Sequence, residues 1–311
     1  MELAPIIVFA YNRPHYLLET LQSLKLNEEA KRSKLFIYCD GPKLNCSEAN
    51  LKQIELVHQI ANREKWCGDV SVIISPVNKG LSASIIKGVT ETVNAYGKVI
   101  VLEDDLSLSP YFLKYMNEAL DKYESNERVA SVSGYNFPIK LPQKDFKETF
   151  FLKSASTLGW GVWKRSWDIF NYDADFLLNE IKLKKLNNEF NFDNTYPFTR
   201  MIKNVISGKV DSWGIRWYAS VFLNNKLTLF PSHSLVNHIG NEGTNIKVDG
   251  SAFFGNAVYN KPINDFENKI AENKVYRGML TAHFDKYNRR KLNLQNIKYY
   301  YLRSLAAIKK V

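Results

Sequence analysis

Four consecutive apolar residues, Val99-Ile-Val-Leu102, run directly into three adjacent acids, Glu103, Asp104 and Asp105. A continuous apolar run is typical of a central strand that is covered on both faces. Ligands of open α/β sheets bind at the carboxyl ends of such strands. Neighbouring carboxylates repel one another unless a cation neutralises them, and hard divalent metal ions prefer oxygen ligands. The segment therefore predicts a buried strand that ends in a metal site, followed by a turn toward water.

The alternative for this acidic cluster is a helix N-terminus. Acidic side chains gather at the positive end of a helix dipole, and Pro110 could open such a helix. A motif match of this length does not by itself choose between the two interpretations.

Strand-like and helix-like segments alternate over the first hundred residues. Apolar runs predict strands at 5–10, ending at Ala10, and at 34–39, 70–74 and 98–103. Helical spacing of apolar residues lies between them. This order predicts an α/β fold with a mostly parallel central sheet and helices on both faces. Right-handed crossovers place the strand ends along one edge, so the polar residues that follow each strand should converge on one cleft: Asn12, Arg13, Asp40, Asn78, Lys79 and the three acids.

These strand-end residues have a common chemical logic. Arg13 and Lys79 could neutralise phosphates, and Asp40 could accept hydrogen bonds from a base or a ribose. The acids could hold a metal ion that bridges a diphosphate. The alternatives are solvated surface charges for the two cations and an ordinary turn residue for Asp40. The Rossmann glycine pattern and the P-loop are both absent, which argues against dinucleotide chemistry and NTP hydrolysis.

Three features of the second half are candidate site elements. Gly159-Trp160-Gly161 would let backbone approach a ligand while the indole offers an apolar face to a sugar; the alternative is a core tryptophan between turn glycines. Asp211 precedes Trp213 and a helical pattern, where the default is a helix cap or a first-turn acid. His238 lies in a glycine-rich segment and is either a ligand or a structural histidine. Residues 177–192 are predicted to form an exposed, mobile helix or lid.

Composition sets the outer limits. The chain has 311 residues, of which 45% are hydrophobic, and a net charge of +10, which suits an anionic partner such as a nucleotide, a nucleic acid or an acidic membrane. The three cysteines show no CxxC spacing, so neither a disulfide framework nor a structural zinc site is expected. The expected compartment is the reducing cytosol. No apolar stretch approaches the length of a membrane span, and no export signal is expected.

Together these motifs resemble the nucleotide-sugar-dependent glycosyltransferases of the GT-A fold. They are most similar to family-two-like bacterial sugar transferases and to the Golgi N-acetylglucosaminyltransferase I group, whose Glu-Asp-Asp motif matches Glu103 to Asp105. The resemblance implies a Rossmann-like GT-A catalytic domain over residues 1–245, with a nucleotide-sugar half at 1–106 and an acceptor half at 107–245. Residues 246–311 would be a C-terminal extension.

The resemblance also implies roles for individual residues. Asp105 would bind Mn²⁺ or Mg²⁺, with Glu103 and Asp104 facing the ribose and the donor sugar. Asp211-Ser-Trp213 is similar to the Asp-Asp-Trp that supplies the general base, although Ser212 replaces the acid next to the tryptophan. The predicted site consists of Asp211 for catalysis, Asp105 and His238 for the metal, and, for the substrate, Ala10, Asn12, Arg13, Asp40, Lys79, Glu103, Asp104, Gly159, Trp160 and Trp213.

The predicted function is a metal-dependent, inverting transfer of a sugar from a nucleoside diphosphate sugar, such as a UDP-sugar, to a glycan, lipid-linked or protein-linked acceptor. One carboxylate can deprotonate the acceptor hydroxyl while the metal stabilises the departing diphosphate. A sugar-phosphate nucleotidyltransferase is the alternative, but residues 11–15 lack the glycines of its usual basic loop. A nucleic-acid-binding module is disfavoured because the basic residues are scattered and no binding motif is present.

Residues 287–311 mix seven basic residues with regularly spaced leucine, isoleucine and tyrosine. This pattern predicts a basic amphipathic helix that binds an anionic membrane surface, where a lipid-linked acceptor would lie. The expected location is therefore cytoplasmic, peripheral at the inner face of the plasma membrane. The alternative is a helix packed on the catalytic domain.

Overall fold

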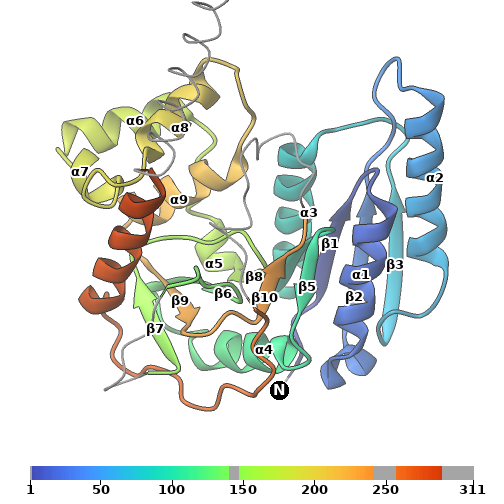
Figure 1. Cartoon of the computed structure of the whole chain (residues 1–311), viewed down its shortest axis with the longest axis horizontal. Helices are drawn as coiled ribbons and strands as arrows, with labels where there is room; N and C mark the ends of the chain where they lie inside the picture. The colour runs from blue at the N-terminus through green and yellow to red at the C-terminus, as the bar shows by residue number, and fades with distance from the viewer. Residues whose placement is uncertain (1, 140–146, 241–256, 289–311) are drawn as a thin grey trace, which may run out of the picture.

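The computed structural model of the chain describes residues 2–139, 147–240 and 257–288 (Figure 1). The first half contains, in order, β1 (Ile6–Ala10), α1 (Pro14–Lys25), η1 (Glu28–Arg32), β2 (Lys34–Cys39), α2 (Glu48–Asn62), β3 (Asp69–Ile74), α3 (Leu81–Tyr96) and β4 (Lys98–Glu103). The second half contains β5 (Leu106–Leu108), α4 (Phe112–Lys122), β6 (Val129–Ser133), β7 (Thr149–Leu152), β8 (Trp160–Trp163), α5 (Lys164–Trp167), α6 (Ala174–Leu183), α7 (Asn187–Phe190), α8 (Phe198–Ile206), α9 (Trp213–Leu223), β9 (Leu227–Pro231) and β10 (Val236–His238). A further helix covers residues 274–288.

Local sequence accounts for several element boundaries. Pro14 lies in the first turn of α1, where a missing N–H leaves no hydrogen bond unmade. Gly97 ends α3 with a φ of 77°, a left-handed conformation that glycine adopts without a steric penalty, and β4 begins at the next residue. These signals bring β4 and its acidic end directly after a helix, as the sequence predicts.

Eight strands form one sheet in the order β3-β2-β1-β4-β8-β6-β9-β7. The pairs β1–β2, β2–β3 and β1–β4 are parallel, and so is β6–β9. Strand β8 is antiparallel to both neighbours, β4 and β6, and β7 is antiparallel to β9. The sheet is thus mostly parallel, as predicted, and its antiparallel members all belong to the second half of the chain.

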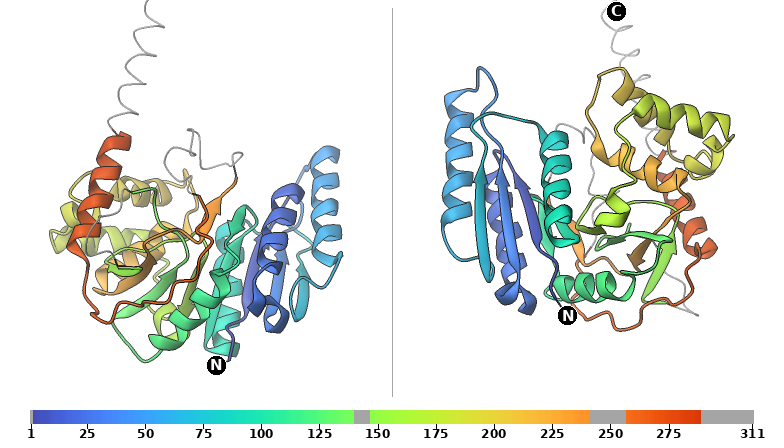
Figure 2. Two further views of the ribbon diagram at one scale, coloured as in Figure 1. Left: turned by 60° about the horizontal axis from the view of Figure 1, so that its bottom comes forward. Right: turned by 180° about the vertical axis from the view of Figure 1, so that it is seen from behind.

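Helices cover both faces of this sheet, which confirms the predicted α/β architecture (Figure 2). Alternate residues of β1 point to opposite faces, as a strand requires. Ile6 and Val8 pack in a core with residues of α1, α2 and α4, whereas Ile7 and Phe9 pack in a second core with residues of α3 and α9. Strand β4 is therefore buried on both faces up to its acidic end.

A third core joins α6, α7, α8 and α9 to the helix at 274–288, which lies beside them in Figure 1. Leu177, Leu178 and Ile181 of α6 and Phe190 of α7 are buried in it. Residues 177–192 are therefore largely helical, as predicted, but the prediction that they form an exposed helix or lid is wrong. These helices are amphipathic, and their charged faces, which suggested exposure, lie opposite an apolar face that packs on α8 and α9.

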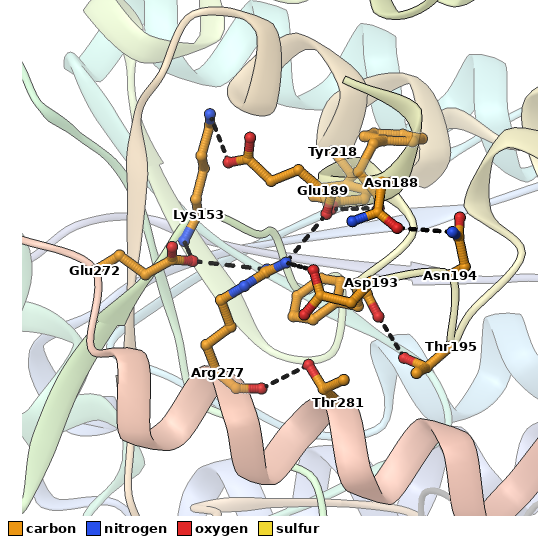
Figure 3. A network of polar contacts seen from close by, with 12 residues as sticks. Lys153, Asn188, Glu189, Asp193, Asn194, Thr195, Tyr218, Glu272, Arg277 and Thr281 are labelled. Atoms are coloured by element: carbon orange, nitrogen blue, oxygen red, sulfur yellow. Dashed lines mark hydrogen bonds and ion pairs between the residues drawn. The ribbon is translucent and has the colours of Figure 1, made fainter. Parts of the chain in front are cut away.

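Arg277 is the centre of a polar network that attaches the helix at 274–288 to the rest of the molecule (Figure 3). Its guanidinium bonds to Asp193 Oδ1 at 3.0 Å and to the Glu189 carbonyl at 3.4 Å, and lies 4.8 Å from the ring centre of Phe192. Glu272 Oε1 accepts the backbone N–H of Lys153. The helix at 274–288 thus packs on the rest of the described chain. The predicted boundary at residue 245 and the tail from 289 lie outside the described residues.

Candidate active site

The ends of β1, β2 and β4 meet at one edge of the sheet, with the loop that follows β3. Arg13, just after β1, forms ion pairs with two acids that follow β4: with Asp104, and with Asp105 Oδ2 at 2.7 Å. The Asp40 carboxylate, after β2, accepts the backbone N–H groups of Lys79 at 2.8 Å and Gly80 at 3.0 Å. The structure thus brings Arg13 to the acids and Lys79 to Asp40 at this edge of the sheet, and a cleft common to both groups stays a prediction.

Helix α1 fixes the turn that carries the acids. The Thr20 hydroxyl donates to the Asp104 carbonyl at 2.8 Å and accepts the Leu106 N–H at 3.0 Å. Ser23 Oγ accepts the Leu108 N–H at 3.1 Å. Neither residue was predicted to belong to the site. Both are buried polar residues on a helix face that otherwise carries leucines, and that position was the available signal.

The sequence predicted that the chain turns toward water after the acids, and the structure contradicts this. Leu106–Leu108 forms β5, which pairs antiparallel with β10, so that His238 lies opposite Leu106. The Ile239 N–H donates to the Asp105 carbonyl at 2.9 Å. The expected loop around His238 is therefore a strand as far as this residue. Its partner strand is too distant in sequence for a local pattern to reveal.

This pairing brings His238 to the predicted metal residue. Its Nε2 lies 3.4 Å from Asp105 Oδ2. A Cβ atom on Gly240 would lie 2.5 Å from the same oxygen, so only glycine allows the backbone to approach this closely. Asp105 is thus enclosed by Arg13, His238 and Gly240.

The three acids differ in their electrostatics. Burial and the neighbouring charge of Asp105 raise the pKa of Glu103 to about 8, and burial raises the pKa of Asp104 to about 6 against the opposing effect of Arg13. Burial would also raise the pKa of Asp105, but the contacts with His238 and Arg13 outweigh it and lower that pKa. Asp105 is therefore the acid of the three that is held ionised most strongly.

The donor set suits a hard divalent cation. Asp105 Oδ1 is buried and has no hydrogen-bond partner among the described residues, a costly state that a bound cation would relieve. No group of three His, Cys, Asp or Glu side chains able to hold a metal occurs within residues 2–139, 147–240 and 257–288. A site with one carboxylate and one imidazole leaves positions for water and substrate phosphates, which Mg²⁺ commonly uses.

Several predicted substrate residues have structural partners. The Asn12 amide donates to Asn50 Oδ1 at 2.6 Å, and Ala10 ends β1 opposite Cys39. Lys79 is exposed beside the Asp40 turn. The Asp40 carboxylate holds three backbone N–H groups, including that of Gly41, so its observed role is to order the loop before α3. A contact between Asp40 and the nucleobase of a substrate stays a prediction.

Trp160, Trp213 and Gly159 occupy interior positions. The Trp160 ring is fully buried and packs 5.2 Å from the ring centre of Trp213, which is itself buried. Gly159 has a φ of 58° and bonds through its carbonyl to the Gly134 N–H at 2.7 Å. For these three residues the structure supports the alternative interpretation, a core position. Trp160 belongs to β8, so it is sheet packing rather than loop flexibility that explains the Gly-Trp-Gly sequence.

Asp211 lies just before α9, close to the first turn of α3. It is not the cap of α9, since Ser212 occupies the N-cap position, which corrects the helix-cap interpretation. Its carboxylate is 68% exposed and pairs with Arg216 Nη2 at 2.6 Å. The same Arg216 nitrogen donates to Ser82 Oγ at 2.8 Å, in the first turn of α3. Arg216 thus positions Asp211 next to the helix that follows the Asp40 loop.

A mostly parallel sheet with an acidic turn at the end of its central strand is consistent with the GT-A fold that the sequence predicts. Residues 6–159, about half of the chain, match the family model described as glycosyl transferase family 2. Over this segment the chain is a family-2-like glycosyltransferase. The matched segment contains β1 to β4 and the acidic turn, and it ends just before β8. The resemblance to the N-acetylglucosaminyltransferase I group stays a prediction.

Among solved structures, the chain is similar to residues 1–349 of S. aureus TarS, with 15% identity and a TM-score of 0.39 over 75% of this chain and 59% of that one. A longer TarS structure gives 14% identity and a TM-score of 0.39 over 76% and 36%. UDP-glucose pyrophosphorylase complexed with UDP-glucose gives 14% identity and a TM-score of 0.35 over 74% and 90%. The chain thus aligns with less than two thirds of either TarS structure. A search of the curated proteins found no match.

Within the described residues, none of the helices combines the length and the apolar character needed to cross a membrane.

Proposed function

We propose that the protein transfers a sugar from a UDP-sugar to a hydroxyl group of a glycan, lipid-linked or protein-linked acceptor, with inversion and with a divalent cation. The observation that carries this proposal is Asp105, a buried ionised carboxylate at the end of β4 with one oxygen left without a partner. The family match supports the transfer of a sugar. The cation, the donor and the stereochemistry are part of the proposal.

Asp105 and His238 would hold Mn²⁺ or Mg²⁺, which would neutralise the charge that develops on the departing diphosphate. Arg13 already carries a positive charge at this position and would share that task. Glu103 and Asp104 would face the ribose and the donor sugar. Asp40 would keep the loop before α3 in place beside the nucleobase of the donor.

Asp211 is the proposed general base. An exposed carboxylate fixed by Arg216 can accept the proton of an acceptor hydroxyl while that oxygen attacks the sugar carbon. A single base and a direct displacement invert the configuration at that carbon. We further propose that the reaction serves the synthesis of a polysaccharide or related glycan at the cytoplasmic face of the plasma membrane.

Thermal shift with nucleotides tests the donor side. UDP together with Mn²⁺ should raise the melting temperature, since a ligand that binds only the folded state stabilises it. UDP with EDTA should have a much smaller effect. Stabilisation by NTP, and none by UDP with Mn²⁺, would favour a sugar-phosphate nucleotidyltransferase and would contradict the proposal.

A further inference from the structure

A groove of about 600 Å³ lies between α3 and the half of the molecule that carries α9, two elements that face each other in the rear view of Figure 2. One wall is a single stripe of α3 from Ser82 to Glu91. The other wall consists of Tyr172, Asp211 and Arg216. The proposed general base thus lies in the wall of a groove that extends away from the acidic turn along α3.

Two hydrogen bonds join α3 to residues of the second half of the chain beside the groove. Arg216 Nη2 donates to Ser82 Oγ at one end, and Trp167 Nε1 donates to Thr90 Oγ1 at 2.8 Å at the other. With a helix rise of 1.5 Å per residue, these two bonds are about 12 Å apart along α3. The groove is therefore long enough for more than one sugar ring.

The charges in the groove are paired. Lys87 Nζ lies 3.6 Å from Glu91 Oε1, and Arg216 pairs with Asp211. The lining thus carries two cations and two anions, in a chain whose net charge is +10. Hydroxyl groups of a neutral ligand can bond to both kinds of side chain, whereas a phosphate would meet no excess of positive charge here.

Tyr172 supplies an aromatic face. The residue is 57% exposed, and its ring lies edge-on against Phe170, with the ring centres 4.9 Å apart. An exposed ring that a neighbour keeps in place provides a flat apolar surface for the face of a sugar ring.

We propose that this groove binds the neutral saccharide part of the acceptor, with Tyr172 stacking on a sugar ring and Asp211 at the end where the reacting hydroxyl lies. The inference rests on the proposed function, because it takes Asp211 as the base. It adds the substrate class: the part of the acceptor next to the reacting hydroxyl is an uncharged glycan and not a phosphate or an anionic lipid head group.

Saturation-transfer NMR tests the proposal, with UDP and Mn²⁺ present. The probes are methyl glucoside, methyl galactoside and methyl N-acetylglucosaminide, each as the monosaccharide and as a homologous disaccharide, with methyl glucuronoside as the anionic counterpart. We expect at least one neutral probe to bind, its disaccharide more tightly, and Tyr172→Ala to weaken that binding roughly fivefold to tenfold. Tyr96→Ala, at the far end of α3 outside the groove, is the matched control and should change nothing.

Glu91→Lys tests the charge argument, because it replaces a paired anion with a cation at an exposed position. The variant should lose affinity for the neutral probe and gain affinity for methyl glucuronoside. Binding of no neutral probe by the unaltered protein, or equal binding by the Tyr172→Ala and Tyr96→Ala variants, would overturn the inference. Preference of the unaltered protein for the glucuronoside would do so too.

Failure of this inference is distinguishable from failure of the proposed function. Binding of UDP with Mn²⁺ is measured on the same samples by calorimetry. If UDP binds and the groove variants have no effect on the probes, only the groove assignment is wrong. If UDP with Mn²⁺ does not bind either, the proposed function is wrong as well.

Discussion

Asp105 joins two parts of the chain that are far apart in sequence. Its side chain contacts Arg13 from the end of β1 and His238 from β10, and its carbonyl accepts a hydrogen bond from Ile239. The sequence predicted both Arg13 and His238 as site residues, but it placed Arg13 at the substrate diphosphate. In the structure Arg13 is paired with the acids, because a buried carboxylate pair is stabilised by the nearest cation.

Asp105→Asn should abolish the dependence of UDP binding on a divalent cation. The amide has nearly the same shape as the carboxylate but cannot supply the negative charge that a metal requires. Isothermal titration with UDP and Mn²⁺ measures the effect, and circular dichroism checks the fold. Unchanged affinity for Mn²⁺ with UDP would remove Asp105 from the metal site.

Asp211→Asn should reduce turnover by roughly 10²-fold or more, because the proton acceptor is lost, while the affinity for UDP stays nearly unchanged. Steady-state kinetics with the acceptor measures turnover. The Asp105→Asn variant serves as the comparison, because it should impair binding of the donor. Normal turnover of Asp211→Asn would leave this residue only its ion pair with Arg216.

The residue-level predictions from sequence succeeded where charge decides the position of a side chain. Charged residues after a buried strand must lie at the sheet edge, so Arg13, Asp40 and the acids were found. Trp160 was ambiguous because an indole can serve either a core or a ligand, and local sequence does not distinguish the two. Its burial depends on the aromatic residues of α5 and α9, which pack around it in the folded chain.

Helix α1 controls the acidic turn at the level of elements. Its Thr20 hydroxyl satisfies a carbonyl and an N–H group that are both buried. A buried backbone group without a partner costs about 1–3 kcal/mol. The geometry of the proposed metal site therefore depends on a helix that contributes no ligand to it.

Thr20→Val should lower the free energy of unfolding by about 2 kcal/mol or more, since it leaves both backbone groups unsatisfied. It should also weaken binding of UDP with Mn²⁺. Urea denaturation and calorimetry measure the two effects. Thr92→Val is the matched control, because the Thr92 hydroxyl donates to the Gly88 carbonyl within α3 and contacts the Tyr38 hydroxyl, but accepts no backbone N–H group, and its loss should cost less than half as much. Equal losses in the two variants would contradict the assigned role of Thr20.

The elements predicted correctly were those that local pattern determines. Strands β1 to β4 are apolar runs separated by amphipathic helices, and each was placed within a few residues. Strands β5, β8 and β10 were missed. Each is short, and each pairs with a strand that is distant in sequence or runs antiparallel, so its existence depends on contacts that no local period encodes.

On the scale of the whole molecule, the described part of the C-terminal extension is integrated into the catalytic unit. Tyr276, Leu280 and Phe284 belong to the same core as α6 and α9, and Arg277 ties the helix to α7 and the turn after it. The resemblance suggested a separate extension because it covers only about the first 245 residues. The alternative that the tail at 287–311 packs on the catalytic domain stays open, since residues 289–311 lie outside the described part of the chain.

Arg277→Ala should reduce stability by about 1–3 kcal/mol, because it removes bonds to Asp193 and Glu189 from a mostly buried guanidinium. Arg277→Lys should recover part of the loss, since it keeps the charge but not the planar set of donors. Thermal denaturation measures stability, and hydrogen exchange over 274–288 locates the change. A melting temperature unaffected by Arg277→Ala would show that apolar packing alone holds this helix.

Removal of residues 289–311 should weaken binding to anionic vesicles without changing hydrolysis of the soluble donor. The removed segment contains seven basic residues, and each could contribute about 1 kcal/mol near an anionic leaflet. Added salt should mimic the truncation, because it screens surface charges. Co-sedimentation with vesicles measures binding. Absence of binding by the full-length chain at low salt would refute a membrane role, and a lowered melting temperature on truncation would favour packing of the tail on the catalytic unit.

The pairing of β5 with β10 affects the order in which the enzyme folds during its synthesis. Contacts between residues distant in the chain form late, because the entropy of closing the intervening loop must be overcome first. A ribosome that has released β1 to β4 has produced the acids and Arg13, but His238 is still to be synthesised. A growing chain therefore carries an incomplete acidic turn, in which Asp105 has Arg13 but not yet His238 or Gly240 beside it. The family 2 segment alone, which ends at residue 159, would remain in that state.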